Sequence, residues 1–205
     1  LCILIPMKRT GIVPLQIDYQ LYQVTMMSPF EEYVYAGDLV TESLMAEYIT
    51  KRYTIGDNLE ELKQRLGEND FVYLASDEML YKSFVATEQP YFELLQQRGV
   101  RRKVEIGRIY PVSFDFWQVR FKTIDTAPNM PVADFLRLMN VNLDTIIEMP
   151  KQGEPLVSSW IATLRMKFSN EKYEDKDLGL INPFGITIIS YDLSYFGNNI
   201  KSKRE

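Results

Sequence analysis

The 205-residue sequence contains no histidine and only one cysteine, Cys2. Without histidine the chain cannot build a Ser-His-Asp triad or a histidine-containing metal site, and it lacks the commonest general base at neutral pH. A single cysteine allows neither an intrachain disulfide nor a Cys-x-x-Cys site for zinc or redox chemistry. Enzymes are therefore the minority interpretation of this chain.

Phosphate-binding signals are also missing. The ten glycines form neither G-x-G-x-x-G nor G-x-x-x-x-G-K-[ST], so no loop is predicted to hold a nucleotide cofactor. The 23 Lys and Arg residues are scattered among 28 Asp and Glu residues, which gives a net charge of −5. Binding to a nucleic-acid backbone needs clustered positive charge, so no direct nucleic-acid site is evident.

Long apolar runs are absent as well. The apolar stretch at residues 1–6 is far shorter than the roughly 20 residues needed to span a bilayer, and no signal-peptide pattern is present. Because Lys8 and Arg9 follow it directly, this apolar stretch resembles the end of a membrane-spanning helix. The alternative is a buried first strand, which the residues alone favour.

Helical periodicity dominates the first half of the chain after a short alternating strand at residues 13–21. Four capping signals mark helix starts, at Ser28, Asp38, Asn58 and Ser76. A further helical turn or two is predicted from Pro90 to Gly99. In the helix that runs through Ile49, Met45 and Tyr48 lie one turn apart and can share a face, which serves either core packing or contact with a second copy.

Beyond residue 101 the period changes from helical to two. Alternating runs predict strands over 104–110, 117–123, 156–168 and about 186–196. Helices followed by strands indicate an α+β fold in which helices pack on one face of an antiparallel sheet.

The connection at about 126–153 is too long for a hairpin, which needs about 2–5 residues, and we interpret it as an insertion. Apolar residues recur within it at helical spacing, at Val132, Phe135, Leu136 and Met139. The stripe either covers the domain's own sheet or offers a docking surface to a partner, and we favour the first.

The segment Asn182, Pro183, Phe184 and Gly185 predicts a rigid, shaped turn before the last strand. Proline fixes its own φ and restricts the residue before it, while glycine can supply a positive φ. By itself such a turn could simply redirect the chain.

Four segments, in the right order along the chain, resemble the periplasmic domain of the VirB-eight family, the inner-membrane assembly factors of bacterial type IV secretion systems. Residues 48–53 are similar to the end of the family's first helix, and 117–121 and 160–168 are similar to two of its strands. The turn at 182–185, leading into 186–191, is similar to the family's Asn-Pro-x-Gly turn and final strand.

The resemblance implies a nuclear-transport-factor-two-like roll, with helices against a curved antiparallel sheet, no catalytic activity and no cofactor. It implies a single periplasmic domain over 11–200, preceded at 1–10 by the end of an inner-membrane helix and followed by a charged tail at 201–205. The function implied is assembly of a type IV secretion channel through weak homodimerisation and contacts with VirB-nine and VirB-ten type subunits. We expect Met45 and Tyr48 to aid self-association and the turn at 182–185 to bind partners.

A different function is open to the same fold, because this roll often has a cone-shaped pocket that binds a small ligand or a substrate. An enzyme of this kind would need a carboxylate base such as Glu105, Asp115 or Asp125. The lining of the pocket separates the two functions. An enzyme needs a carboxylate or tyrosine that points into an open cavity, whereas a scaffold should fill that space with side chains such as Trp117, Trp160 and Leu164. A carrier of folded cargo would instead need an exposed apolar patch.

Overall fold

The structure, a computed structural model, describes residues 15–18, 23–26, 36–113, 115–168, 181–182 and 184–200. Contacts divide the chain into two compact units, Leu1–Leu39 and Val40–Glu205. In the first unit β1 (Leu15–Asp18), which lies within the strand predicted over 13–21, pairs antiparallel with β2 (Gln23–Met26). The stretch at 1–6 and the helix start at Ser28 lie outside the described residues. None of the described helices is long and apolar enough to cross a membrane.

In the described part of the chain, four helices precede the main sheet: α1 (Ala36–Tyr53), α2 (Leu59–Leu66), α3 (Phe71–Leu74) and α4 (Glu78–Gln97). Asn58 caps α2 as predicted, because its side chain accepts a hydrogen bond from the backbone N–H of Glu60 at 2.9 Å. The cap of α4 is Asp77, one residue later than the predicted Ser76.

Pro90 lies inside α4, where the sequence predicted a separate short segment from that residue onward. A proline removes one backbone donor and usually ends or kinks a helix. Here buried side chains on both sides of it, among them Phe84 and Phe92, fix both halves of α4 against the core. Tertiary packing thus overrides the local preference.

The main sheet consists of β3 (Arg101–Ser113), β4 (Phe116–Thr126), β5 (Leu156–Phe168) and β6 (Ile186–Asn198). Neighbouring strands are antiparallel and follow the order of the sequence. Each strand matches one of the predicted alternating runs, and β5 has the predicted bounds.

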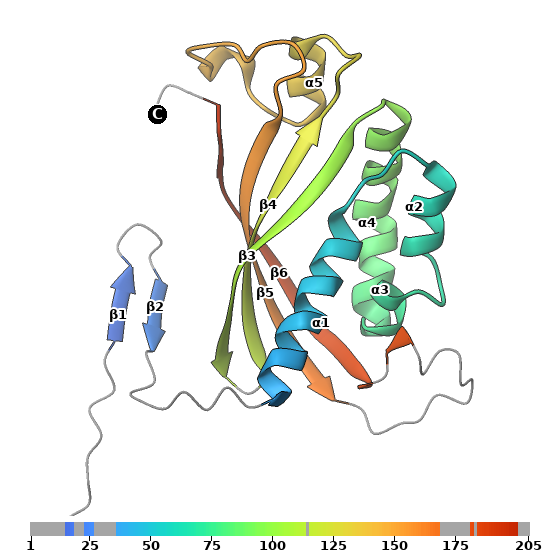
Figure 1. The fold of residues 1–205 in the computed structure, drawn as a ribbon, viewed down its shortest axis with the longest axis vertical. Coiled ribbons are helices and arrows are strands. Elements are labelled where there is room, and N and C mark those ends of the chain that lie inside the picture. The colour runs from blue at the N-terminus through green and yellow to red at the C-terminus, as the bar shows by residue number, and fades with distance from the viewer. Residues whose placement is uncertain are drawn as a thin grey trace, which may run out of the picture. The chain divides into compact units, whose positions relative to one another are not determined.

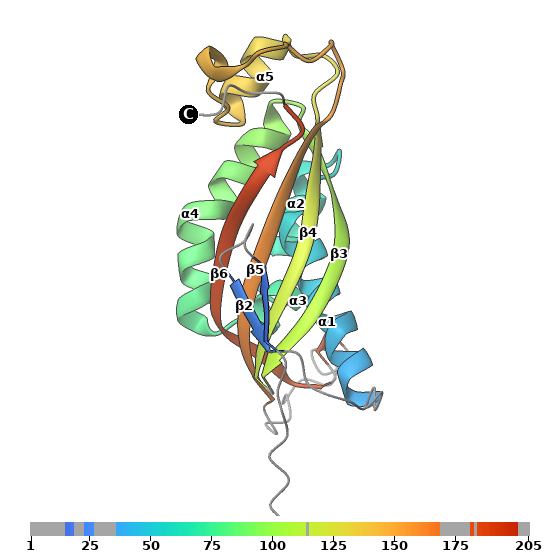
Figure 2. The ribbon, with the colours of Figure 1, turned by 90° about the vertical axis from the view of Figure 1, so that its left-hand side faces the viewer.

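The helices α1 to α4 lie on one face of this sheet (Figures 1 and 2), which confirms the predicted α+β class. The core lies between the two layers. Alternate residues of β4, such as Trp117, Val119 and Phe121, face the helices and are 2%, 0% and 2% exposed. Burying each such side chain contributes about 1.5–3 kcal/mol, so the alternation in the strands decides which face the helices cover.

The connection between β4 and β5 contains α5 (Val132–Leu138) and a 3-10 turn, η1 (Leu143–Thr145), beyond the ends of those two strands (Figure 1). Phe135 and Leu136 are 5% and 1% exposed and belong to the main core cluster, against which Val132 and Met139 also pack. The apolar stripe therefore covers the domain's own core, as the favoured interpretation predicted, and it is not free to dock a partner.

Candidate functional site

The predicted turn before β6 is held by Asn182, whose side chain is buried at 1% exposure. Its amide nitrogen Nδ2 donates to the carbonyl oxygens of Leu74, the last residue of α3, and of Ile186, at 3.2 and 2.9 Å. Its amide oxygen Oδ1 accepts from the N–H of Ile186 at 3.1 Å. One side chain thus ties the turn to both the last strand and the helical layer.

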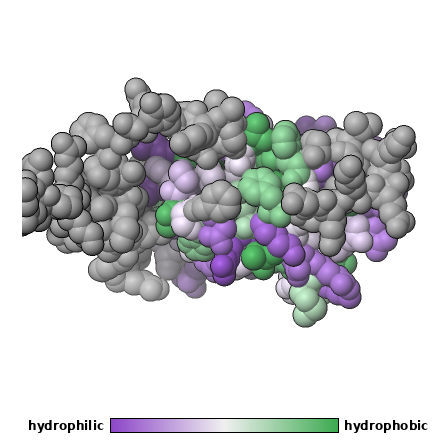
Figure 3. Space-filling model, turned by 90° about the horizontal axis from the view of Figure 1, so that it is seen from below, coloured by the Kyte–Doolittle hydropathy of each residue, from purple (hydrophilic) through white to green (hydrophobic). Residues whose placement is uncertain are grey.

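The outer side of this turn is exposed. The Phe184 ring is 50% exposed, and two further large hydrophobic side chains are exposed on the adjoining strands, Phe168 on β5 and Ile189 on β6. Pro183 lies outside the described residues. Figure 3 shows the end of the main unit at which β5 ends. Hydrophobic surface lies next to hydrophilic surface there. The turn therefore combines a fixed backbone with an aromatic side chain available to a partner.

Gly185 has a positive φ of 58°, and its N–H donates to the carbonyl of Asn182 at 3.0 Å. A β-branched side chain disfavours this left-handed conformation. We expect Gly185→Val to lower the free energy of unfolding by about 1–3 kcal/mol, measured by urea denaturation. The exposed Gly153 also has a positive φ, of 79°, with open space around it. If Gly153→Val lowered the free energy of unfolding much more than Gly185→Val, the result would contradict the view that the turn before β6 is the strained and packed position.

The structure places Met45 and Tyr48 in the core, both at 0% exposure. They do share a face of α1, but it is the face that packs inward, where the Tyr48 hydroxyl contacts Ser76 Oγ at 2.8 Å. Core packing, the alternative noted for them, therefore accounts for both residues. Among the residues of α1 whose exposure the structure describes, exposed side chains such as Ser43 and Glu47 are available to a second copy.

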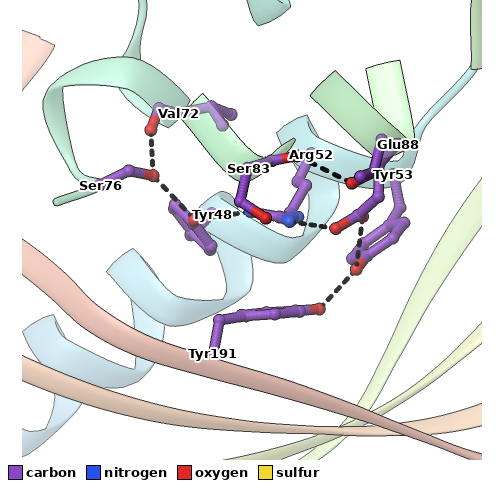
Figure 4. Close-up of polar contacts among 9 residues, drawn as sticks. Tyr48, Arg52, Tyr53, Val72, Ser76, Ser83, Glu88 and Tyr191 are labelled. Carbon is purple, nitrogen blue, oxygen red and sulfur yellow. Dashed lines mark hydrogen bonds and ion pairs between the residues drawn. The ribbon is translucent and has the colours of Figure 1, made fainter. Parts of the chain in front are cut away.

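A polar cluster that sequence analysis missed lies between α1, α4 and β6 (Figure 4). At its centre Arg52 is 1% exposed. The guanidinium donates to Glu88 Oε1 at 2.5 Å and to the Tyr48 hydroxyl at 3.0 Å. The Tyr53 hydroxyl donates to Glu88 Oε2 at 3.2 Å and contacts the Tyr191 hydroxyl at 2.7 Å. The cluster joins both layers of the fold through hydrogen bonds.

Aromatic rings complete the surroundings of Arg52. Its guanidinium carbon lies 4.3 Å from the ring centre of Phe84 and 4.4 Å from that of Tyr191, within the range of cation–π contacts. Burial disfavours its charge, but the tyrosines and Glu88 outweigh burial and hold the pKa of Arg52 above its ordinary value. Burial raises the pKa of Tyr53 and of Tyr191, so both phenols stay protonated at neutral pH.

The three carboxylates considered as bases have other partners. Asp125, at 0% exposure, accepts from Arg102 Nε at 2.6 Å, and burial raises its pKa, with Arg102 acting in the opposite direction. Asp115 pairs with Arg165 at 2.7 Å, and Glu105 pairs with Lys103 at 2.9 Å. Within the described part of the chain, no group of three or more metal-ligating side chains is found.

An open cavity of about 520 Å³ lies between the sheet, the end of α1, the second half of α4 and the connection that contains α5. Tyr53, Glu88 and Trp160 line it, whereas Trp117 and Leu164 are packed in the core. Of the three side chains expected to fill this space in a scaffold, Trp117 and Leu164 belong to the main core cluster and Trp160 lines the open cavity. Tyr53 and Glu88 thus border an open cavity, which is the feature set out above for an enzyme, but the Tyr53 hydroxyl donates to Glu88, and Glu88 pairs with the buried Arg52.

The family models and the curated proteins contain no match to this chain. Solved structures do match. The VirB8 protein of Agrobacterium tumefaciens is 19% identical, with a TM-score of 0.58 over 83% of this chain and 98% of that one. The soluble domain of TrwG, from the type IV secretion machinery of Bartonella grahamii, is 18% identical, with a TM-score of 0.55 over 79% and 97%.

TraE in complex with 4-(1H-pyrrol-1-yl)pyridine-2-carboxylic acid is 14% identical, with a TM-score of 0.55 over 83% of this chain and 100% of that one. All three matches therefore span nearly the whole of the other structure. The resemblance seen in the sequence is confirmed at the level of the fold: this chain has the α+β fold shared by VirB8, TrwG and TraE.

Proposed function

We propose that the chain is a non-catalytic structural and assembly component of a type IV secretion channel. The observation that carries this proposal is the fold, which is that of VirB8 and of a soluble domain of the TrwG secretion component over most of the chain. By this proposal the domain lies in the periplasm, attached to the bacterial inner membrane, and contacts channel subunits of the VirB-nine and VirB-ten type.

The proposed contact surface is the turn at Asn182, Pro183, Phe184 and Gly185. Two observations support it: Asn182 fixes the backbone of the turn from inside, and Phe184 is half exposed outside. An aromatic ring on a rigid backbone loses little conformational entropy on binding, which is the property of residues that dominate interface energies.

Self-association is part of the proposal as well. Because Met45 and Tyr48 are buried, a second copy would meet the polar outer side of α1 or another surface. An interface without a large apolar centre is expected to be weak, so the homodimer we propose dissociates readily.

We expect Phe184→Ser to leave the melting temperature unchanged while it reduces recovery of VirB-nine and VirB-ten type subunits, co-purified from membranes, by roughly fivefold or more. The reason is that a half-exposed ring contributes little to folding but can anchor an interface. Phe196→Ser, on β6 and 40% exposed, is the matched control and should leave recovery unchanged.

Equal recovery with both variants would contradict the assignment of the turn as the contact surface. Failure of the wild-type chain to recover any channel subunit would contradict the proposed function itself.

A further inference from the structure

The cavity beside α5 has features of a binding site. Its volume of about 520 Å³ falls within the range of roughly 300–1,000 Å³ that is typical of small-molecule pockets. Part of its wall is formed by the connection between β4 and β5, including Met139, Val141 and Ile146. The insertion therefore encloses space here, although its apolar stripe packs on the core.

The lining of the cavity is rich in aromatic rings, which come from α1, α4 and three strands: Tyr53, Tyr91, Phe92, Phe121, Trp160 and Tyr195. These rings hold one another in place. The ring centres of Tyr53 and Phe121 are 5.4 Å apart in a stacked arrangement, and those of Trp160 and Tyr195 are 4.9 Å apart. The walls are thus formed before any ligand enters, and they present flat apolar surfaces.

The charges that border the cavity are paired within the protein. Arg102 pairs with the fully buried Asp125, and Glu88 pairs with the buried Arg52. Several polar groups of the lining also have internal partners. Trp160 Nε1 donates to Thr123 Oγ1 at 3.0 Å, and the Tyr91 hydroxyl donates to the carbonyl of Leu138 at 3.1 Å. A charged ligand would lose its hydration here without finding a free counter-charge in these two ion pairs.

We propose that this cavity binds an uncharged, largely apolar small molecule that contains a flat ring system. The aromatic walls supply contact with the faces of the ligand, and the paired charges select against ions. The proposal is independent of the channel role proposed above, because it rests on the cavity and not on the turn at 182–185.

The test uses two fluorescent probes that share one ring system. N-phenyl-1-naphthylamine is uncharged, and 1-anilinonaphthalene-8-sulfonate carries an added sulfonate; the emission of both rises in an apolar site. With the full chain we expect saturable binding of the uncharged probe at one site, and binding of the sulfonate that is weaker by about tenfold or more.

Two variants on β5 locate the site. Ser158 is 5% exposed and lines the cavity, so Ser158→Phe places a ring inside it and should weaken binding of the uncharged probe by about tenfold or more. Ser159 is the next residue along the strand and its side chain points to the other face, so Ser159→Phe should leave binding within about twofold. If Ser158→Phe does not fold, Asn142→Trp, at an exposed position of the cavity rim, takes its place.

Three results would overturn the proposal. They are the absence of saturable binding of the uncharged probe, equal affinity of the two β5 variants, and binding of the sulfonate as tight as that of the uncharged probe.

Discussion

Replacing Arg52 by alanine is expected to lower the free energy of unfolding by about 3–5 kcal/mol, because it leaves a partly buried carboxylate without its partner. The side chain of Glu88 is only 33% exposed, and Arg52 is the cation that pairs with it at 2.5 Å. The substitution also removes the stacking on Phe84 and Tyr191. For a domain of this size the loss corresponds to a fall in melting temperature of roughly 6–20 °C, which urea and thermal denaturation can both measure.

Two comparisons separate the charge from the packing. Arg52→Lys keeps the charge but cannot donate to both Tyr48 and Glu88 while stacking on two rings, so it should recover only part of the loss. Combining Arg52→Met with Glu88→Gln removes both charges and should be less harmful than Arg52→Ala. Lys82→Ala breaks an ion pair whose side chains are 67% and 77% exposed, and should leave the free energy of unfolding almost unchanged. An Arg52→Ala cost as small as that of Lys82→Ala would contradict a structural role for the cluster.

Asn182→Ala is expected to lower the free energy of unfolding by about 2–4 kcal/mol, because it leaves three backbone groups near Leu74 and Ile186 without this partner. Asn182→Asp should be at least as harmful. It keeps the oxygen that accepts from the N–H of Ile186, but it has no N–H to donate and brings a carboxylate against two carbonyl oxygens.

Asn199 provides a matched control for this prediction. Its side chain makes the same kinds of bond, accepting from the N–H of Val157 at 2.9 Å and donating to the carbonyl of Pro155 at 3.1 Å, but the residue is exposed. Water can replace these bonds, so Asn199→Ala should cost less than about 1 kcal/mol. Similar costs for the two alanine variants, by urea denaturation, would show that the buried position of Asn182 has no special importance.

The strands of the main sheet could be predicted because the alternation that identifies each strand lies within one short stretch of sequence. In β5 the alternation of apolar and polar residues over 156–168 coincides with the observed strand, since a period of two admits few other structures. In contrast, periodicity shows that Met45 and Tyr48 share a face but not what covers it. Only the arrangement of α1 against α4 and the sheet decides that both are core residues.

Arg52 was missed for a related reason. A basic residue in the last turn of a helix is ordinarily explained by the helix dipole and is expected to be exposed. Its burial depends on Phe84, Glu88 and Tyr191, which are distant in sequence. A cone-shaped pocket was expected from the resemblance, but its lining by Trp160 was not, because the shape of the cavity depends on where the connection after β4 turns back.

The attachment of β6 has a consequence for how the domain folds. Ile188 exchanges backbone hydrogen bonds with Ala75 and Asp77, more than 100 residues earlier, and Asn182 bonds to Leu74. Contacts of such long range slow folding, because a large loop must close before they form. The helical layer is complete in sequence by Gln97, yet the backbone hydrogen bonds of Ala75 and Asp77 with Ile188 form only after β6 has been synthesised. Until then β5 has an open edge, the kind of strand edge on which chains aggregate.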